Sequence, residues 1–280
     1  MQAPSPSKFI VRFFFIFFPI IVHTAEIKAQ GNLLVNPKRV VFEGKNRVIS
    51  LNLANTGTDT ASYNISLVQY RMKENGSFEE ISQPDSLQRF ADKFLRIFPR
   101  TVTLGPNEAQ VVKVQLTRTN LLLPGEYRSH LYFRAVHAEK PLGQIFKDTS
   151  KNISISLNPV FGISIPVIIR SGETLTKADI TNIQYQMEGG DTPQLKMQIN
   201  RDGNFSIYGD LTITHVSPQG KNTLIGIAKG ISIYTPNSKR LFVINLNKGV
   251  NYHAGKIKVE YAAQPDAKPE TFAKVYLNLN

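Results

Sequence analysis

The chain has 280 residues, 41% of them hydrophobic, and a formal net charge of +12. This length allows one or two domains with well-filled cores. The absence of cysteine excludes thiol catalysis, thiolate metal sites and disulfide-stapled scaffolds. The basic residues are scattered and never form a run of five or six like charges. The composition therefore argues against a nucleic-acid-binding arm and for a basic surface that faces acidic partners.

The chain begins with a pattern typical of a secretory signal peptide. Lys8 and Arg12 precede ten apolar residues, 13–22. That run is too short for a membrane span, which needs about 20 residues, but it fits the hydrophobic region of a signal peptide. We place the cleavage between Ala25 and Gln30 and expect residues 1–30 to be removed on export. The mature protein then keeps a net charge of +10.

The first half of the mature chain alternates short apolar runs with turns rich in Gly, Pro, Asn and Asp, which is typical of an immunoglobulin-type β-sandwich. The segment 85–95 has Leu87, Phe90, Ala91 and Phe94 at helical spacing, and we expect a short helix there. The expected strands are residues 34–42, 47–53, 62–71, 94–98, 109–116, 126–136 and 153–169.

The last of these strands begins with a regular alternation. Ile153, Ile155 and Leu157 form one apolar row, because successive side chains of a strand point to opposite faces. Serine occupies the positions between them, and Phe161 and Ile163 follow further along. Such a strand can be laid into the groove of another protein. The alternative is an ordinary sandwich strand with one face in the core of its own domain.

The composition changes at residues 170–173, where a long apolar run ends and a polar stretch begins. We expect a first domain over residues 31–170 and a second, smaller β-sandwich over residues 171–280. Hairpin-type turns are expected at residues 188–190, 201–204 and 218–220. The expected strands of this second domain are residues 180–187, 194–200, 210–215, 224–233, 239–244, 255–262 and 271–279.

Three stretches of the first half follow one another in a characteristic order. They are NPKRVVFEG at residues 36–44, FPRTVTLGP at 98–106 and PGEYRSHLYF at 124–133. In this order and spacing they resemble the periplasmic chaperones of the chaperone–usher pilus family. The resemblance covers roughly residues 33–170. It implies an all-β protein of two immunoglobulin-like β-sandwich domains in an L-shaped (boomerang) arrangement.

The resemblance also implies a function in the periplasm. Chaperones of this family lend their G strand to a pilus subunit that lacks its own last strand, a mode called donor-strand complementation. The donor residues would be Ile153, Ile155, Leu157, Phe161 and Ile163. The implied partners are fimbrial subunits and the outer-membrane usher, or a second copy of the chain capped by the same strand. No cofactor, nucleic acid or small-molecule substrate is implied.

The family holds the terminal carboxylate of the subunit with an arginine on the first strand and a lysine on the G strand. Arg39 matches the position of that arginine, and the alternative is a solvated arginine on the sandwich surface. The lysine is missing, because its place falls near Gly162 or Ser164. Lys38 and Arg170 are near in sequence, with no geometric reason to prefer either.

We expect neither catalytic residues nor a metal site. The five histidines show no spacing that suggests a zinc site, and no nucleophile elbow or phosphate-binding loop is present. No motif therefore supports an enzyme, and the resemblance implies a chaperone. The alternative is a secreted adhesin or structural component of a surface assembly that shares the two-sandwich architecture, because fold alone does not fix function.

Overall fold

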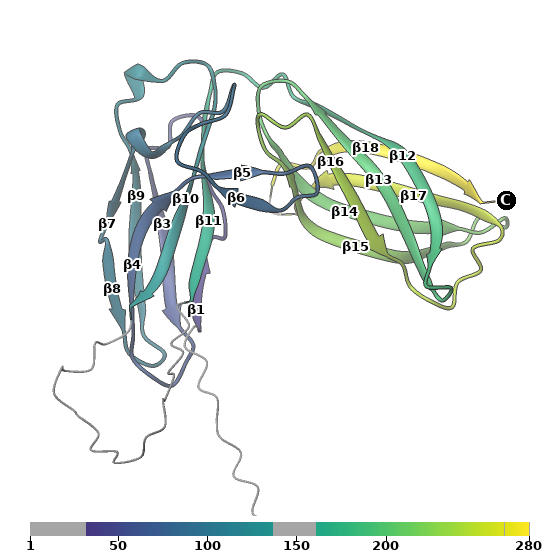
Figure 1. The fold of residues 1–280 in the computed structure, drawn as a ribbon, viewed down its shortest axis with the longest axis horizontal. Coiled ribbons are helices and arrows are strands. Elements are labelled where there is room, and N and C mark those ends of the chain that lie inside the picture. Colours follow the sequence, from purple (N-terminus) through teal and green to yellow (C-terminus); the bar gives the residue numbers. More distant parts are fainter. Residues whose placement is uncertain (1–31, 137–160, 266, 280) are drawn as a thin grey trace, which may run out of the picture.

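The computed structural model describes residues 32–136, 161–265 and 267–279. Figure 1 shows two β-sandwich domains that meet at an angle like the arms of an L. The all-β class and the two-sandwich, L-shaped arrangement expected from the sequence are confirmed. The expected signal peptide and the donor residues Ile153, Ile155 and Leu157 lie outside the described residues. Within the described part, no helix is long and apolar enough to cross a bilayer.

The first domain packs two sheets face to face. Their strands pair antiparallel, except that β2 and β11 pair in parallel. One sheet has the order β1-β3-β9-β7, and the other has the order β2-β11-β10-β4-β8. Their strands are β1 (Leu33–Asn36), β2 (Val40–Phe42), β3 (Val48–Asn55), β4 (Ala61–Val68), β7 (Leu95–Phe98), β8 (Thr101–Leu104), β9 (Ala109–Leu116), β10 (Gly125–Val136) and β11 (Gly162–Ser171).

The second domain has a three-stranded sheet of order β12-β13-β16 and a four-stranded sheet of order β15-β14-β17-β18. Its strands are β12 (Lys177–Glu188), β13 (Thr192–Asp202), β14 (Ile207–Val216), β15 (Asn222–Ile233), β16 (Lys239–Asn245), β17 (Gly255–Ala263) and β18 (Thr271–Leu279). One core is built from residues 33–169 and the other from residues 180–279. The domain limits at residues 170 and 171 stay a prediction, with the two cores on either side of them.

Strand alternation places the two cores. In β9, Val112, Val114 and Leu116 are buried while the residues between them are exposed. In β13, Leu195 and Met197 are likewise buried, and the residues that alternate with them are partly exposed. Each fully buried side chain of this kind stabilises its domain by about 1.5–3 kcal/mol. The alternation of apolar and polar residues along each strand therefore places one face of the strand toward the core and the other face away from it.

The expected single strand over residues 34–42 is wrong, because it is divided into β1 and β2. Pro37 lies between the two parts and has no backbone N–H to donate to a sheet ladder. After this break the chain changes sheets: β1 pairs antiparallel with β3, whereas β2 pairs in parallel with β11. This change places Arg39 directly before the parallel pair, at the side of the domain that faces its neighbour.

The expected helix over residues 85–95 is also wrong. Only a single 3-10 turn, η1 (Asp92–Phe94), is helical there; a further 3-10 turn, η2 (Thr119–Leu121), follows later in the chain. Leu87 is 86% exposed with φ of 67°, so it does not join the apolar face that its spacing suggested. Asp85 instead pairs with Arg71, and the Gln88 side chain donates to the Tyr70 carbonyl. These contacts hold the segment against the neighbouring hairpin in an irregular conformation.

The turn expected at residues 188–190 is confirmed, because it joins the paired strands β12 and β13. Gly189 and Gly190 both have positive φ, the conformation that tight hairpin turns require. The turn at residues 218–220 likewise joins β14 and β15. The hairpin expected at residues 201–204 is wrong: that segment crosses from β13 in one sheet to β14 in the other.

A short hairpin leaves the first domain and reaches the second. It consists of β5 (Tyr70–Met72) and β6 (Phe78–Glu80). Figure 1 shows it crossing the space between the two sandwiches. Its turn contacts β16, because the Leu241 N–H donates to the Glu74 carbonyl at 2.7 Å. The hairpin thereby ties the first domain to the edge of a sheet in the second.

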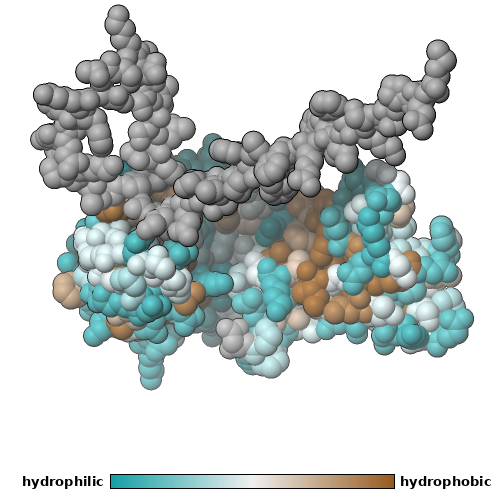
Figure 2. Space-filling model, turned by 90° about the horizontal axis from the view of Figure 1, so that it is seen from below, coloured by the Kyte–Doolittle hydropathy of each residue, from teal (hydrophilic) through white to brown (hydrophobic). Residues whose placement is uncertain are grey.

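The second domain has an apolar strip on the side of its edge strands β15 and β16. Figure 2, which views the molecule from below, shows a hydrophobic area on the right-hand domain. Exposed apolar side chains on these strands are Leu224 and Ile227 of β15 and Leu241 and Val243 of β16, each about half exposed. Leu241, one residue of this strip, also donates its backbone N–H to the β5–β6 hairpin.

Candidate functional site

The candidate site lies where the outer face of the first domain meets the second. In β10 the side chains of Leu131 and Phe133 point into the core of the first domain. The alternate residues Glu126, Arg128 and His130 therefore point away from that core, and yet all three are buried. A polar strand face that is buried must be covered by something other than its own core. Here the second domain and the β5–β6 hairpin cover it.

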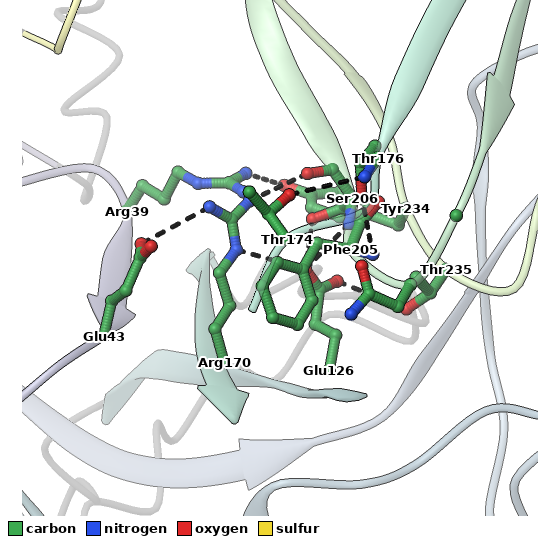
Figure 3. Close-up of polar contacts among 12 residues, drawn as sticks. Arg39, Glu43, Glu126, Arg170, Thr174, Thr176, Phe205, Ser206, Tyr234 and Thr235 are labelled. Carbon is green, nitrogen blue, oxygen red and sulfur yellow. Dashed lines mark hydrogen bonds and ion pairs between the residues drawn. The ribbon is translucent and has the colours of Figure 1, made fainter. Parts of the chain in front are cut away.

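Glu126 is the polar tie between the two domains, shown with its partners in Figure 3. Its carboxylate has no exposed surface. One oxygen accepts hydrogen bonds from the backbone N–H and the hydroxyl of Ser206, at 2.8 and 2.7 Å. The other accepts from the hydroxyl of Thr235 at 3.2 Å. Arg170 lies 3.5 Å from the same carboxylate and donates to the Ser206 carbonyl at 2.8 Å.

Apolar and aromatic side chains complete the contact between the domains. Met72, Ile168 and Tyr234 form a small buried cluster of their own, which combines the hairpin, β11 and the second domain. The Asn237 side chain donates to the Met72 carbonyl at 2.8 Å. The ring of Phe78 lies 6.1 Å from that of Tyr234. These contacts fix the orientation of the second domain relative to the outer face of β10 and β11.

Arg39 reaches into this region from the start of β2. It is partly buried, and its guanidinium donates to the Tyr234 hydroxyl at 2.9 Å. The same guanidinium lies 4.4 Å from the ring centre of Tyr208 and 5.3 Å from that of Tyr234. The first domain therefore supplies the cation and the second supplies the aromatic faces against which it stacks, an arrangement that holds a guanidinium in place without neutralising it. Figure 3 shows Arg39 beside Tyr234.

Arg128 lies on the same face and is 3% exposed. Its guanidinium is 4.4 Å from the ring centre of Tyr234, so Arg39 and Arg128 both stack near one ring. Burial lowers the pKa of Arg128, and the charge of Arg39 adds to that effect, while Tyr234 and Glu126 oppose it. The site thus contains two guanidinium groups close enough to influence each other.

His130 occupies the centre of an aromatic group beside these arginines. Its ring lies 5.0 Å from that of Tyr70, 5.7 Å from Phe78 and 6.4 Å from Tyr234. Burial lowers the pKa of His130 to about 3, and the charges of Arg128 and Arg39 contribute in the same direction. The imidazole is therefore neutral at physiological pH. The two guanidinium groups of Arg39 and Arg128 thus form a positively charged region in which a third cation, such as a protonated His130, is disfavoured.

The other predicted site residues lie as follows. Phe161, just before β11, is 46% exposed. Ile163 is partly buried against the core of the first domain and pairs with Phe133 of β10. Lys38 is exposed, and Arg170 is engaged by Glu126 and Ser206. Of these two basic residues, Lys38 is therefore not buried between the domains, and the guanidinium of Arg170 is already engaged.

Sequence reasoning missed Arg128, Tyr208 and Tyr234. Arg128 belongs to the quoted stretch at residues 124–133, where charged or polar residues alternate with apolar ones. That alternation was available as a signal, but it is the same for a solvated face and for a face covered by a second domain. Tyr208 and Tyr234 come from the second domain, where the sequence resemblance was weakest.

No family model and no curated protein matches this sequence. Several solved structures are similar. The YadV chaperone has 13% identity, with 89% of this chain and 100% of that chain covered and a TM-score of 0.44. The Pseudomonas aeruginosa CupB2 chaperone has 12% identity, coverage of 88% and 100%, and a TM-score of 0.44. A chain in the complex of the Salmonella enterica SafA pilin with the SafB chaperone has 14% identity, coverage of 90% and 98%, and a TM-score of 0.43. At these identities the likeness concerns the fold alone.

Proposed function

We propose that this chain is a periplasmic chaperone that binds, folds and caps fimbrial subunits by lending them a strand, and that delivers them to an outer-membrane usher. The observation that carries the proposal is the position of Arg39. The residue that the sequence resemblance selected as the carboxylate anchor lies between the two domains, partly exposed, with its guanidinium held by tyrosines and not by an acid among the described residues. A guanidinium held in this way can bind a terminal carboxylate by two parallel hydrogen bonds.

The strand that would be lent leads toward this anchor. In β11, Ile163, Ile165 and Val167 face the core of the first domain at alternate positions. Ile153, Ile155 and Leu157 are also at odd-numbered positions, so the apolar alternation of β11 has the same phase earlier in the sequence. Strand addition satisfies an open sheet edge with backbone hydrogen bonds, and alternate side chains fill the adjacent groove. Three such side chains can each contribute about 1.5–3 kcal/mol when fully buried in a client.

Replacing Leu157 with arginine is expected to abolish client binding and to leave the free protein folded. A charged side chain at a donor position would have to be buried, unpaired, in the apolar groove of the subunit. The test is capture of partners by the tagged protein from its native periplasm, with mass spectrometry of the eluate. The proposal expects a stoichiometric partner of pilin-like size that the L157R variant loses.

Leu175→Arg is the matched control, because Leu175 is 73% exposed in the second domain. It should retain the partner. Unfolding of the L157R variant on its own would mean that the residue belongs to an ordinary core strand. Recovery of surface glycans, or of no partner, from the wild-type protein would favour the adhesin or structural alternative.

Replacing Arg39 with alanine is expected to weaken the client complex by about 2–4 kcal/mol, or roughly 30- to 1000-fold in the dissociation constant, because a buried charge-assisted pair loses one partner. The measurement is the affinity of the purified variant for the captured subunit. Arg47→Ala serves as the control, because Arg47 is exposed and bonds only to nearby backbone carbonyls. Equal affinities for R39A and R47A would remove Arg39 as the anchor.

A further inference from the structure

One face of the second domain combines cationic, aromatic and apolar side chains. It is the outer face of the sheet β15-β14-β17-β18, which is turned away from the core of that domain. The strand register aligns its side chains in rows that cross the sheet. One row is Leu224, Thr214, Lys258 and Tyr276, and the next is Ile227, Thr212, Glu260 and Lys274. Since neighbouring strands are about 4.8 Å apart, each row spans about 15 Å of the sheet.

Three lysines gather around Tyr276 at one end of these rows. Nζ of Lys256 lies 4.9 Å from the centre of the Tyr276 ring, and Nζ of Lys274 lies 6.0 Å from it. Lys258 is the cross-strand partner of Tyr276. Of the three lysines, only Lys258 forms an ion pair among the described residues, with Glu260 at 3.4 Å. This end of the face therefore keeps a net positive charge, and the tyrosine beside the lysines is 48% exposed.

The other end of the rows is apolar. Leu224 and Ile227 of the edge strand β15 are each 48% exposed. In a regular strand, two residues three positions apart point to opposite faces. Here a β-bulge lies between them, where Ile213 pairs with Gly226 and the next residue, Thr214, pairs with Leu224. The bulge places both apolar side chains on the same outer face as the lysines.

We propose that this face binds the surface of a bilayer that contains anionic lipids. Lipid phosphates supply the negative charge that Lys256 and Lys274 do not find within the described part of the chain. Lysine and tyrosine combine an apolar body with a polar tip, which suits the boundary between headgroups and acyl chains. The apolar end adds area that leaves water on contact with that boundary. An acidic protein would need the lysines but would not need the apolar end.

The first test is sedimentation of the full mature protein with vesicles of equal parts phosphatidylcholine and phosphatidylglycerol. We expect binding that is lost on phosphatidylcholine alone and in high salt. Each lysine near an anionic surface strengthens binding about fivefold, so the double variant Lys256→Gln, Lys274→Gln should bind about 30-fold more weakly. Lys45→Gln, Lys113→Gln is the matched control, because it removes the same charge from exposed positions of the first domain. The control should bind as the wild type does.

A second pair of variants tests the apolar end. Leu224→Thr with Ile227→Thr should weaken binding about tenfold, because less apolar area leaves water. Leu241→Thr with Val243→Thr is the control: these residues are 49% and 50% exposed but lie on the outer face of the other sheet. Threonine suits a strand, so all these variants should keep the unfolding temperature of the wild type.

Fluorescence locates the contact, because the chain contains no tryptophan. In the variant Tyr276→Trp, emission should shift to shorter wavelength when the anionic vesicles are added, since the indole enters a less polar region. Phe98→Trp is the control, at a 76% exposed position of the first domain, and its emission should not change.

Three results would each overturn the proposal: no binding to the anionic vesicles, equal losses in K256Q/K274Q and its control, or unshifted emission in Y276W. A fourth would overturn it in favour of an acidic polypeptide partner, namely binding of polyglutamate as tight as that of vesicles with no effect of L224T/I227T. The rows contain neither Arg39 nor any residue of β11, so these variants should still capture a pilin-sized partner. Failure of the membrane surface and failure of the chaperone function are therefore distinguishable.

Discussion

Replacing Glu126 with alanine is expected to loosen the junction between the two domains and to cost about 3 kcal/mol of stability. The change leaves the Ser206 N–H and hydroxyl, the Thr235 hydroxyl and the Arg170 guanidinium without their shared acceptor. Each buried donor left unsatisfied costs about 1–3 kcal/mol, and removal of one partner of a buried ion pair costs about 3–5 kcal/mol. Partial exposure of Arg170 and relaxation around the alanine place the expected total below the sum of these values.

The measurement should report on the junction itself. Amide hydrogen exchange at Ser206 is expected to accelerate strongly in the E126A variant, because this N–H donates to the carboxylate that is removed. Small-angle X-ray scattering is expected to show a broader distribution of interdomain angles. Urea unfolding supplies the loss of stability.

Glu43→Ala is the matched control for this prediction. Glu43 contacts the same Arg170 at 3.5 Å but its side chain is 60% exposed, so the loss should stay below about 1 kcal/mol. Equal effects of E126A and E43A, or unchanged exchange at Ser206, would show that the buried carboxylate does not hold the domains together.

The all-β architecture could be predicted from the sequence because its determinants are local. Alternation of apolar and polar residues places strands such as β9 and β13, and paired glycines place the turn between β12 and β13. The secondary-structure predictions were wrong where tertiary contacts override the local spacing of apolar residues, as in residues 85–95. Leu87 has helical spacing relative to Phe90, but Asp85 and Gln88 are bound by side-chain contacts with the hairpin strand β5. The spacing of apolar residues along the sequence does not indicate contacts of this kind.

The candidate site could be predicted only in part. Arg39 was selected because it belongs to a recognisable stretch of sequence, and the structure places it between the domains. Arg128 was overlooked, although it is on a quoted stretch too. Its environment depends on Tyr70 and Tyr234, which are 58 and 106 positions away. A strand pattern shows that Arg128 points away from its own core, but it does not show that another domain covers that face.

β10 therefore has two buried faces with opposite requirements. One face, with Leu131 and Phe133, stabilises the first domain through apolar burial. The other holds Glu126, Arg128 and His130 against the second domain. Of these three, Glu126 is fully engaged by donors, whereas Arg128 and His130 retain buried nitrogens without partners. Glu126, which joins the two domains, and Arg128, whose charge is not paired, thus lie two positions apart on one strand. An anion that bound near Arg128 would therefore also lie close to the contact between the domains.

His130 should make the fold sensitive to mild acid. Its folded-state pKa of about 3 lies below the ordinary value of 6.5, because burial and the charges of Arg128 and Arg39 disfavour the imidazolium form. The neutral ring is surrounded by Tyr70, Phe78 and Tyr234. Since the unfolded chain binds this proton more readily, the contribution to stability is fully present above pH 6.5 and is lost as the pH falls from 6.5 towards 3.

The expected loss is about 1.4 kcal/mol per pH unit within that window, or about 3 kcal/mol at pH 4.5. Urea unfolding of the wild type and of His130→Gln between pH 7.5 and 4.5 measures it, and the stability of H130Q should decline less by that amount. His253→Gln, at an exposed position, should follow the wild type. Parallel curves for all three proteins would mean that His130 takes up a proton without cost.

The charge of Arg128 is one cause of the low pKa of His130. Replacing Arg128 with methionine should therefore raise the pKa of His130 and reduce the loss of stability between pH 7.5 and 4.5. The pKa of His130 thus reports on the positive charge in this region.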